Sequence, residues 1–373
     1  MSTLNLSSDT AIDELAATIA EGATVLGMGE STRFGHETFD LRDRLLRRLV
    51  HDHAFRALAV QDSAGVGADL DAYVLGEGTA ESALRNAWRP WRTAEMVATL
   101  EWIRAYNAEH ADDPVRILGV KPVQAQPADY DAVLEAVGEA APDLAAHLDP
   151  IRTAHQVDEH VQRARGIHPG RPFAEHARDA LALVASVPGL APDVLARMHL
   201  IVEFHERSVA GRGSYASDAE VWAGTVVAYQ RSHGVRVAYW DGIGHTSATP
   251  VGVGLAPGDG AEPTVGSVLR GRYGTGYVSL GIGFHHGDLG VAVVPDPSPD
   301  WVDAKLGATG APANWLDLRD EPGAWEGPAR LRVISGVYDP ARDADEHLAV
   351  ASLVDAFDVL VQVREESAVT WLA

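Results

Sequence analysis

The sequence contains no cysteine among its 373 residues. This absence excludes disulfide bonds, catalysis by a thiolate and zinc sites built on Cys ligands. The sequence also has no apolar run of the roughly 18 to 20 residues that a membrane-spanning helix requires. Its first residues, MSTLNLSSDTAIDELAATIAEG, do not place a basic segment before an apolar one. We therefore expect no secretory signal peptide and a cytoplasmic protein.

The sequence has few positively charged residues. It contains 30 Lys and Arg residues and 53 Asp and Glu residues, so its net charge is -23. Such a charge repels nucleic acids and anionic membrane surfaces, so we expect neither as a partner. Hydrophobic residues make up 46% of the chain, a share typical of a globular protein with a substantial core. The expected partner is a small molecule.

The first 60 residues show the pattern of a β-strand, an α-helix and a second β-strand. Residues 23–28 (ATVLGM) form a short apolar run between two glycines, which is typical of a buried strand. Ser31 or Thr32 can cap a helix that continues to about residue 49, and residues 55–60 (FRALAV) indicate the next strand. This order predicts a parallel sheet with a right-handed crossover.

The rest of the chain adds widely spaced strands and a long helical segment. Further strands are expected at residues 115–120, 235–240, 331–337 and 359–364, with a hairpin at 277–283 and 290–294. Helices are expected at 11–21, 79–110 and 216–232, and a connecting loop at 249–263. The fold class we expect is α/β, with a mainly parallel central sheet flanked by helices. Residues 1–125 and 213–373 would form the N-terminal and C-terminal parts of this α/β core. The Ala- and Leu-rich residues 126–212 would form a helical insertion.

Polar side chains follow four of the expected strands. They are Glu30, the pair Gln61 and Asp62, Lys121, and the run from Asp241 to His245. In parallel α/β sheets the functional site lies beyond the carboxyl ends of the strands. The pattern indicates a site at one edge of the sheet, although each residue alone is equally consistent with a solvated loop.

The junction from Gly27 to Arg42 is the richest of these strand ends. On a helix, Glu30 and Arg33 would stand at i and i+3, and Arg33 and Glu37 at i and i+4. That spacing fits either a row of ion pairs on the helix surface or charged side chains placed at a helix N-terminus. Arg42 lies about half a rotation from Arg33 on an ideal helix. The two arginines can therefore share a site only if the chain around Arg33 is still a loop.

Histidines and tryptophans offer further candidates. His245 lies after a glycine at a strand end, where a structural and a functional role are both open. His285 and His286 are adjacent, and adjacent strand residues point to opposite faces, so the pair predicts a poor shared metal site. Trp88 and Trp91 flank a proline and fit either core packing or substrate contact. The sequence has no HExxH, Walker A or GxSxG motif.

The run LGMGESTRFGHETFDLRDRLLRRLV is similar to the N-terminal signature of the erythromycin esterase family, which also includes succinoglycan biosynthesis proteins. That signature is a strand, then Gly-Glu-x-[Ser/Thr]-His, then a helix with an arginine. The resemblance continues in order through WRPWRTAEMVATLEWIRAYN, RGSYASDAEVWAG, VAYWDGIGHTS, YVSLGIGF and DAFDVLVQV. It implies an α/β fold with a helical insertion, and ester or lactone hydrolysis by a water that a histidine activates. It also implies that no metal ion and no cofactor take part.

The resemblance carries over to five site residues. Glu30 and Arg42 match the Glu and the helix Arg of the first motif. His245 matches the second His of a His-Asn-x-His motif. Arg212 and Asp218 match an Arg and a Glu of a later helix, with the acid shortened by one methylene.

Three positions depart from the family pattern. Arg33 stands at the place of the family's catalytic His, Gln61 at that of a Glu, and Gly242 at that of the first His of His-Asn-x-His. Arginine keeps its proton near neutral pH, so Arg33 cannot act as a general base. Together with Arg42, it would favour a carboxylate, a phosphate or a developing oxyanion.

The resemblance and these departures leave several roles open. His36 can replace the missing base with Glu30 orienting it, or His245 or Glu30 can move the proton. We therefore take Glu30, His36 and His245 as candidate catalytic residues. The expected substrate contacts are Arg33, Arg42, Gln61, Arg212, Asp218 and Asp241.

Three functions fit this site. The first is ester or lactone hydrolysis of a small natural-product-type metabolite, whose anionic group the arginines would hold. The second is a biosynthetic lyase, dehydratase or cyclase reaction on the same scaffold. The third is ligand binding without catalysis.

Overall fold

The structure is a computed structural model of the chain, and it describes residues 2–4, 8–208, 215–320, 322–345 and 347–372. The chain divides into two compact units. A sheet unit comprises Met1–Asp62, Val66–Lys121 and Tyr215–Ala373, and a helical unit comprises Ser63–Gly65 and Pro122–Ser214. Among the described residues, no helix combines the length and the apolar character that crossing a bilayer requires.

The sheet unit begins with the predicted strand–helix–strand pattern. Strand β2 (Val25–Glu30), helix α2 (His36–His53) and strand β3 (Phe55–Ser63) follow one another. β2 pairs in parallel with β5 (Arg236–Gly242) on one side and with β7 (Tyr277–Asp288) on the other, and β3 pairs in parallel with β5. The mainly parallel sheet expected from the sequence is thereby confirmed.

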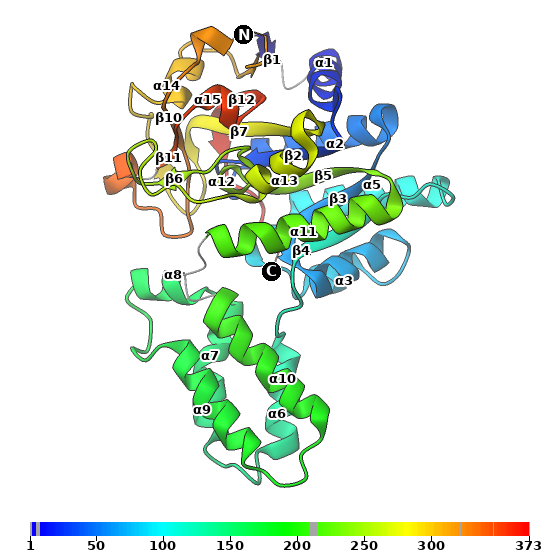
Figure 1. Ribbon diagram of the computed structural model, residues 1–373, viewed down its shortest axis with the longest axis vertical. Helices are drawn as coiled ribbons and strands as arrows, with labels where there is room; N and C mark the ends of the chain where they lie inside the picture. Colours follow the sequence, from blue (N-terminus) through cyan, green and yellow to red (C-terminus); the bar gives the residue numbers. More distant parts are fainter. Residues whose placement is uncertain (1, 5–7, 209–214, 321, 346, 373) are drawn as a thin grey trace. The chain divides into compact units, whose positions relative to one another are not determined.

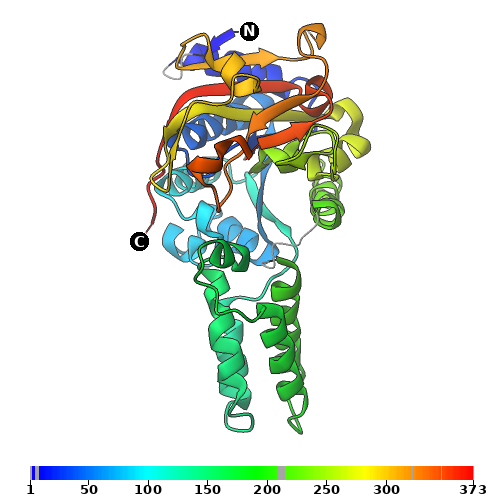
Figure 2. The same cartoon turned by 90° about the vertical axis from the view of Figure 1, so that its left-hand side faces the viewer.

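The full sheet has nine strands. The remaining ones are β1 (Ser2–Leu4), β4 (Arg116–Lys121), β8 (Val293–Val294), β9 (Ala313–Asp317) and β12 (Val359–Ser367). Their order is β1-β9-β12-β7-β2-β5-β3-β4, with β8 paired to β7. In Figure 2 the parallel strands β7 (yellow) and β12 (red) run side by side. β9 joins β12 in the antiparallel direction.

Helices and a small second sheet complete this unit (Figure 1). The helices are α1 (Asp9–Ala20), α3 (Ala64–Val74), α4 (Ala80–Leu84), α5 (Ala94–Glu109), α11 (Tyr215–His233), α12 (Ile243–Thr246), α13 (Val265–Tyr273), α14 (Val302–Gly307) and α15 (Leu353–Ala356). The small sheet has the order β10 (Ala329–Arg332), β11 (His347–Val350) and β6 (Gly252–Val253).

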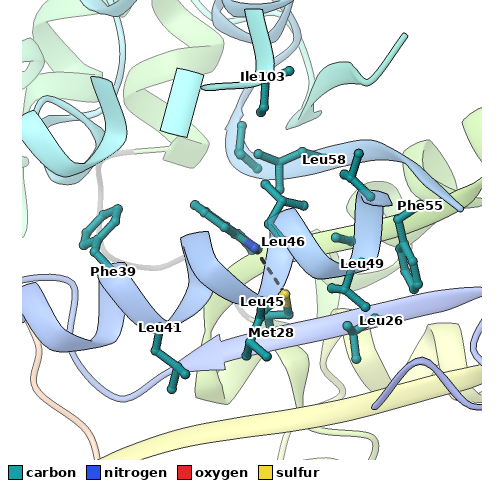
Figure 3. Packing of buried hydrophobic residues seen from close by; sticks show 14 of the residues in the cluster. Leu26, Met28, Phe39, Leu41, Leu45, Leu46, Leu49, Phe55, Leu58 and Ile103 are labelled. Carbon is teal, nitrogen blue, oxygen red and sulfur yellow. Dashed lines mark hydrogen bonds between the residues drawn. The ribbon is translucent and has the colours of Figure 1, made fainter. Parts of the chain in front are cut away.

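Alternating side chains bury both faces of the parallel strands. Leu26 and Met28 of β2 belong to a core shared with α1, α2 and α5, and Figure 3 shows them beside Leu45 and Leu49 of α2. The dashed line in that figure is the hydrogen bond that the indole of a β5 tryptophan donates to Met28 Sδ at 3.3 Å. Val25 belongs instead to the core shared with α11 and α13. Burial on both faces explains why the strand sequences read as continuous apolar runs.

The helical unit has a core of its own. Its helices are α6 (Pro127–Val137), α7 (Leu144–Arg152), α8 (Glu159–Ala164), α9 (Phe173–Ala185) and α10 (Pro192–Glu203), followed by a π-helical turn at Phe204–Ser208. Leu144, Leu148 and Ile201 are fully buried in this core, which draws only on residues from 125 to 204.

Some expected elements differ from the structure. The hairpin at 277–294 is confirmed, because β7 and β8 pair in the antiparallel direction. The expected loop at 249–263 instead contains β6, which pairs with β11, and a bridge between Val251 and Glu262. The strand expected at 331–337 ends at Arg332. Helix α3 was not expected from the sequence.

Candidate active site

Glu30 ends strand β2, and the alternation along the strand decides where its side chain lies. Leu26, Met28 and Glu30 share the face of the sheet that α2 covers. On α2, Arg42 stands in the buried stripe three residues before Leu45. The Arg42 guanidinium therefore meets Glu30, and its Nη1 donates to Glu30 Oε2 at 2.6 Å with both side chains fully buried.

Aromatic rings enclose the Arg42 guanidinium. Its Cζ lies 4.8 Å from the ring centroid of Phe39 and 4.7 Å from that of Trp240. Burial lowers the pKa of Arg42, and the charge of Glu30 opposes this effect, so the arginine remains protonated. Glu30 occupies Nη1 of Arg42, whereas its Nε and Nη2 are buried with no hydrogen-bond partner among the described residues. The expected substrate contact at Arg42 stays a prediction.

Arg33 lies in the loop between β2 and α2, because the helix begins only at His36. Its Nε donates to Glu30 Oε1 at 2.8 Å and its Nη2 to Asp241 Oδ1 at 2.9 Å. The guanidinium also stacks on Trp88, with Cζ 4.4 Å from the ring centroid. The loop lets both arginines converge on one carboxylate, which an ideal helix would not allow. Arg33 thus joins β2 and β5 through the side chains at their ends.

Because Gly242 has no side chain, the guanidinium of Arg33 can lie directly beside its Cα. A Cβ added at position 242 would lie 2.8 Å from Arg33 Nη2. Gly242 has a φ of -67°, which any residue adopts, so space and not backbone conformation favours glycine here. Arginine at position 33 and glycine at position 242 therefore depend on each other for space.

Asp241 is held on both carboxylate oxygens. Tyr239 donates its hydroxyl to Oδ2, and the Gly242 N–H donates to Oδ1 at 2.6 Å. Burial raises the pKa of Asp241, and the charge of Arg33 and the Tyr239 hydroxyl counteract it. Burial likewise raises the pKa of Glu30, which Arg42 and Arg33 counteract. We take both groups as carboxylates, because each accepts charge-assisted hydrogen bonds from a guanidinium at 2.9 Å or less.

His245 is carried by the short helix α12, which crosses close over β2. Gly29 permits this approach, because a Cβ there would lie 2.8 Å from the Cα of Ile243. His245 Nε2 lies 3.4 Å from Gln61 Nε2, and its ring centroid lies 5.2 Å from that of Trp222. Burial lowers the pKa of His245 well below its ordinary value, and the charges of nearby cations lower it further. The imidazole is therefore neutral near pH 7 and able to accept a proton.

The other candidate residues from the sequence are placed differently. His36 Nδ1 lies 2.8 Å from Glu95 Oε1, and its side chain is 50% exposed. Its partner is thus Glu95, while both oxygens of Glu30 are held by arginines. Asp218 is half-buried on α11. Arg212 lies outside the described residues.

His285 and His286 come together, in contrast to the expectation that adjacent strand residues diverge. Their Nδ1 atoms lie 2.9 Å apart, and Asp296 Oδ1 lies within 3.6 Å of both. The three groups are spaced as ligands of one metal ion could be. Burial lowers the pKa of His285, the charge of Asp296 opposes this effect, and the charges of Arg364 and Arg332 add to it. Asp296 therefore favours a cation at this place, and the two arginines oppose it.

Sequence reasoning named Lys121 at a strand end but did not count it among the site residues. Its Nζ lies 5.2 Å from the ring centroids of both Trp88 and Trp222. Trp88 is fixed by its backbone N–H, which donates to Asp62 Oδ2 at 2.8 Å. The position of Lys121 at the end of a buried strand was the sequence signal for a site residue. Its contacts with the two indoles could not be predicted, because Trp88 and Trp222 belong to segments distant in sequence. Its charge also acts on His245 and Asp241.

Comparison with known proteins places the chain in a family. The sequence model of the erythromycin esterase family matches residues 50–366. A segment of 96 residues is 29% identical to the erythromycin esterase type II of Escherichia coli, and it spans 26% of this chain and 23% of that relative. The alignment thus covers about a quarter of the curated relative's length.

Solved structures share the fold over nearly the whole chain. A Bacillus cereus protein is 19% identical, with a TM-score of 0.67 over 100% of this chain and 96% of that one. A succinoglycan biosynthesis protein is 18% identical, with a TM-score of 0.65 over 99% and 95%. A mutant of the erythromycin esterase EreC in its open conformation is 16% identical, with a TM-score of 0.58 over 98% and 97%.

Proposed function

Because the chain belongs to the erythromycin esterase family, we propose that it hydrolyses an ester or lactone bond in a small natural-product-type metabolite. The observation that carries this proposal is the neutral His245 next to an ordered cluster of charges. Glu30, Arg33, Arg42 and Asp241 form that cluster through hydrogen bonds of 2.6 to 2.9 Å. A proton acceptor beside fixed positive charge is what attack by water on a carbonyl requires.

In the proposed reaction, His245 removes a proton from a water molecule as the water oxygen attacks the carbonyl carbon. Negative charge then develops on the carbonyl oxygen, and the positive charge of Arg33 stabilises it. Collapse of the intermediate breaks the bond to the leaving oxygen, which takes the proton back from the His245 imidazolium. Glu30 acts through Arg33 as a positioning residue, since arginines hold both of its oxygens.

The substitution His245→Ala tests this proposal. Removing a general base costs roughly 100- to 10,000-fold in turnover, so we expect a loss of that order in kcat with the protein still folded. A panel of small esters and lactones, followed by product mass, gives the rate. Circular dichroism and the thermal midpoint report folding. The matched control is His199→Ala, because His199 is an exposed histidine of the helical unit.

Two outcomes contradict this assignment. Full activity in His245→Ala combined with loss of activity in His36→Ala would move the base to His36. Full activity in both variants would exclude a histidine base at either position. A wild-type protein that retains a metabolite without converting it would instead support ligand binding without catalysis.

Arg33 favours a second candidate, a lyase, dehydratase or cyclase reaction. A permanently charged group at the place of the family's base suits the stabilisation of an enolate or a leaving carboxylate as well as that of a tetrahedral oxyanion. Labelled water separates the two reactions. Hydrolysis places one ¹⁸O atom from water in the product, whereas elimination and cyclisation place none.

A further inference from the structure

Lys121 is a rare residue in this chain. The sequence contains two lysines, Lys121 and Lys305, although it has 30 Lys and Arg residues together. Lys305 is exposed on α14, whereas Lys121 is the half-buried last residue of β4. An ammonium is a compact charge with three rotatable donors, and arginine does not replace it where a single anionic oxygen must be met.

The charges around Lys121 do not balance. Glu30 and Asp241 offset Arg33 and Arg42, with which they form ion pairs of 2.6 to 2.9 Å. Within the part of the chain that the structure describes, no carboxylate comes within the 4.0 Å of an ion pair from Lys121. Its described neighbours are the faces of Trp88 and Trp222. Of the five charges of Glu30, Asp241, Arg33, Arg42 and Lys121, that of Lys121 is the one that no ion pair offsets within the described residues.

We propose that Lys121, between the indoles of Trp88 and Trp222, binds an anionic oxygen of the substrate, from a carboxylate or a phosphate. This inference rests on the proposed function in one respect, because it takes the bound molecule to be the substrate of the proposed reaction. Arg42 is fully buried, and Arg33 already donates hydrogen bonds to Glu30 and Asp241, so Lys121 is the cation better placed for this anion. The indole faces orient the lysine and partly desolvate it, which strengthens its attraction for an anion.

Binding of an anion at Lys121 would also activate His245. The positive charge of Lys121 lowers the pKa of His245, so a bound anion that offsets this charge makes the imidazole a better proton acceptor. The base would thus gain strength only when the substrate is in place. An anionic substrate is also consistent with an acidic chain, because the excess positive charge is local.

The two lysines allow a direct test by NMR. Protein labelled with ¹³C at lysine Cε gives two side-chain signals, and Lys121→Met identifies the one from Lys121. Benzoate and inorganic phosphate are titrated separately, with benzamide as the neutral match for benzoate. We expect a saturable shift of the Lys121 signal with at least one anion, no shift with benzamide, and no saturable shift of Lys305. A response to benzoate alone indicates a carboxylate, and a response to phosphate alone indicates a phosphate.

The proposal is overturned if neither anion shifts the Lys121 signal saturably, or if benzamide shifts it as much as benzoate does. This outcome is separate from the proposed function, because the titration needs no turnover. A protein that hydrolyses esters without binding either anion contradicts the Lys121 site alone. A protein that binds the anion at Lys121 but converts no ester or lactone contradicts the proposed hydrolysis alone.

Discussion

At the scale of single residues, Arg33 and Gly242 depend on each other for space. Arg33 bridges Glu30 and Asp241, which lie on strands more than 200 positions apart in sequence. Its guanidinium lies where a side chain at position 242 would stand. Arginine keeps its proton near neutral pH, so Arg33 supplies a fixed positive charge at this edge of the sheet. In the proposed reaction, His245 is the residue that transfers the proton.

The coupling of these two positions predicts a non-additive effect on stability. Gly242→Ala should push Arg33 away from Asp241 and destabilise the protein by about 1 to 3 kcal/mol, the usual cost of overpacking. In an Arg33→Ala background the same methyl group has room. We therefore expect Gly242→Ala to cost less there, with a coupling of roughly 0.5 to 3 kcal/mol. Urea unfolding of the four proteins measures it, and strict additivity would contradict the coupling.

The sequence predicted part of this site. Glu30, Gln61, Lys121 and Asp241 could be placed at one sheet edge, because the carboxyl ends of parallel strands meet there. Which of them would pair could not be predicted, since Arg33 selects Asp241 across 208 positions. The pairing depends on strand order, and strand order is a property of the assembled sheet.

At the scale of elements, strand β12 caps helix α2. Thr38 donates its backbone N–H to Glu366 Oε2 at 3.3 Å and its hydroxyl to Oε1. Glu366 is buried at the helix N-terminus, where an unpaired N–H would otherwise remain. Glu37 lies beside it, and both its oxygens accept hydrogen bonds from Ser367. Burial and the Glu37 carboxylate raise the pKa of Glu366 to about 8.

This cap predicts a stability that depends on pH. Glu366 holds its proton in the folded state up to about pH 8 but loses it near pH 4.5 in the unfolded chain. The folded state binds more protons in that window, so stability falls as the pH rises from 4.5 to 8 and the effect levels off above it. The contribution is about 1.4 kcal/mol per pH unit. Glu366→Gln should remove this slope, since the amide cannot ionise.

Chemical denaturation of both proteins at a series of pH values measures the difference. The difference between the stability curves of the two proteins removes the contribution of groups that titrate in both. One such group is the buried Asp303, whose pKa is raised to about 6. We expect the variant to gain stability relative to the wild type as the pH rises towards 8. A constant difference across that range would show that Glu366 is ionised in the folded state.

Elements with regular apolar patterns were predicted best. The sequence predicted the positions of β2, α2, β3 and β5. Most of their ends lie within three residues of the predicted ends. Helix α3 was not predicted, and its Gly67 lies at a close contact with β4. A Cβ at Gly67 would lie 2.8 Å from the Cα of Gly119 in β4. A glycine that serves close contact between elements looks the same in sequence as one that ends a helix.

At the scale of the whole molecule, the chain holds separate apolar cores. The cluster around Leu148 uses residues 125 to 204 alone, and the cluster around Leu58 uses residues of the sheet unit alone. Each unit therefore buries enough apolar surface to unfold on its own. The long run of Ala and Leu between residues 126 and 212 predicted helices, and their shared core explains why that run is so apolar.

Separate cores predict separate unfolding. Leu148→Ala should destabilise the helical unit by about 2 to 5 kcal/mol, the usual cost of a large cavity, and leave the sheet unit unchanged. Leu58→Ala should do the reverse. Hydrogen exchange followed by mass spectrometry assigns each loss of protection to a segment, and the two variants serve as controls for each other because both side chains are fully buried leucines. If either substitution raised exchange equally in both units, the two cores would belong to a single cooperative structure, and the helical unit could not move or unfold independently of the candidate active site.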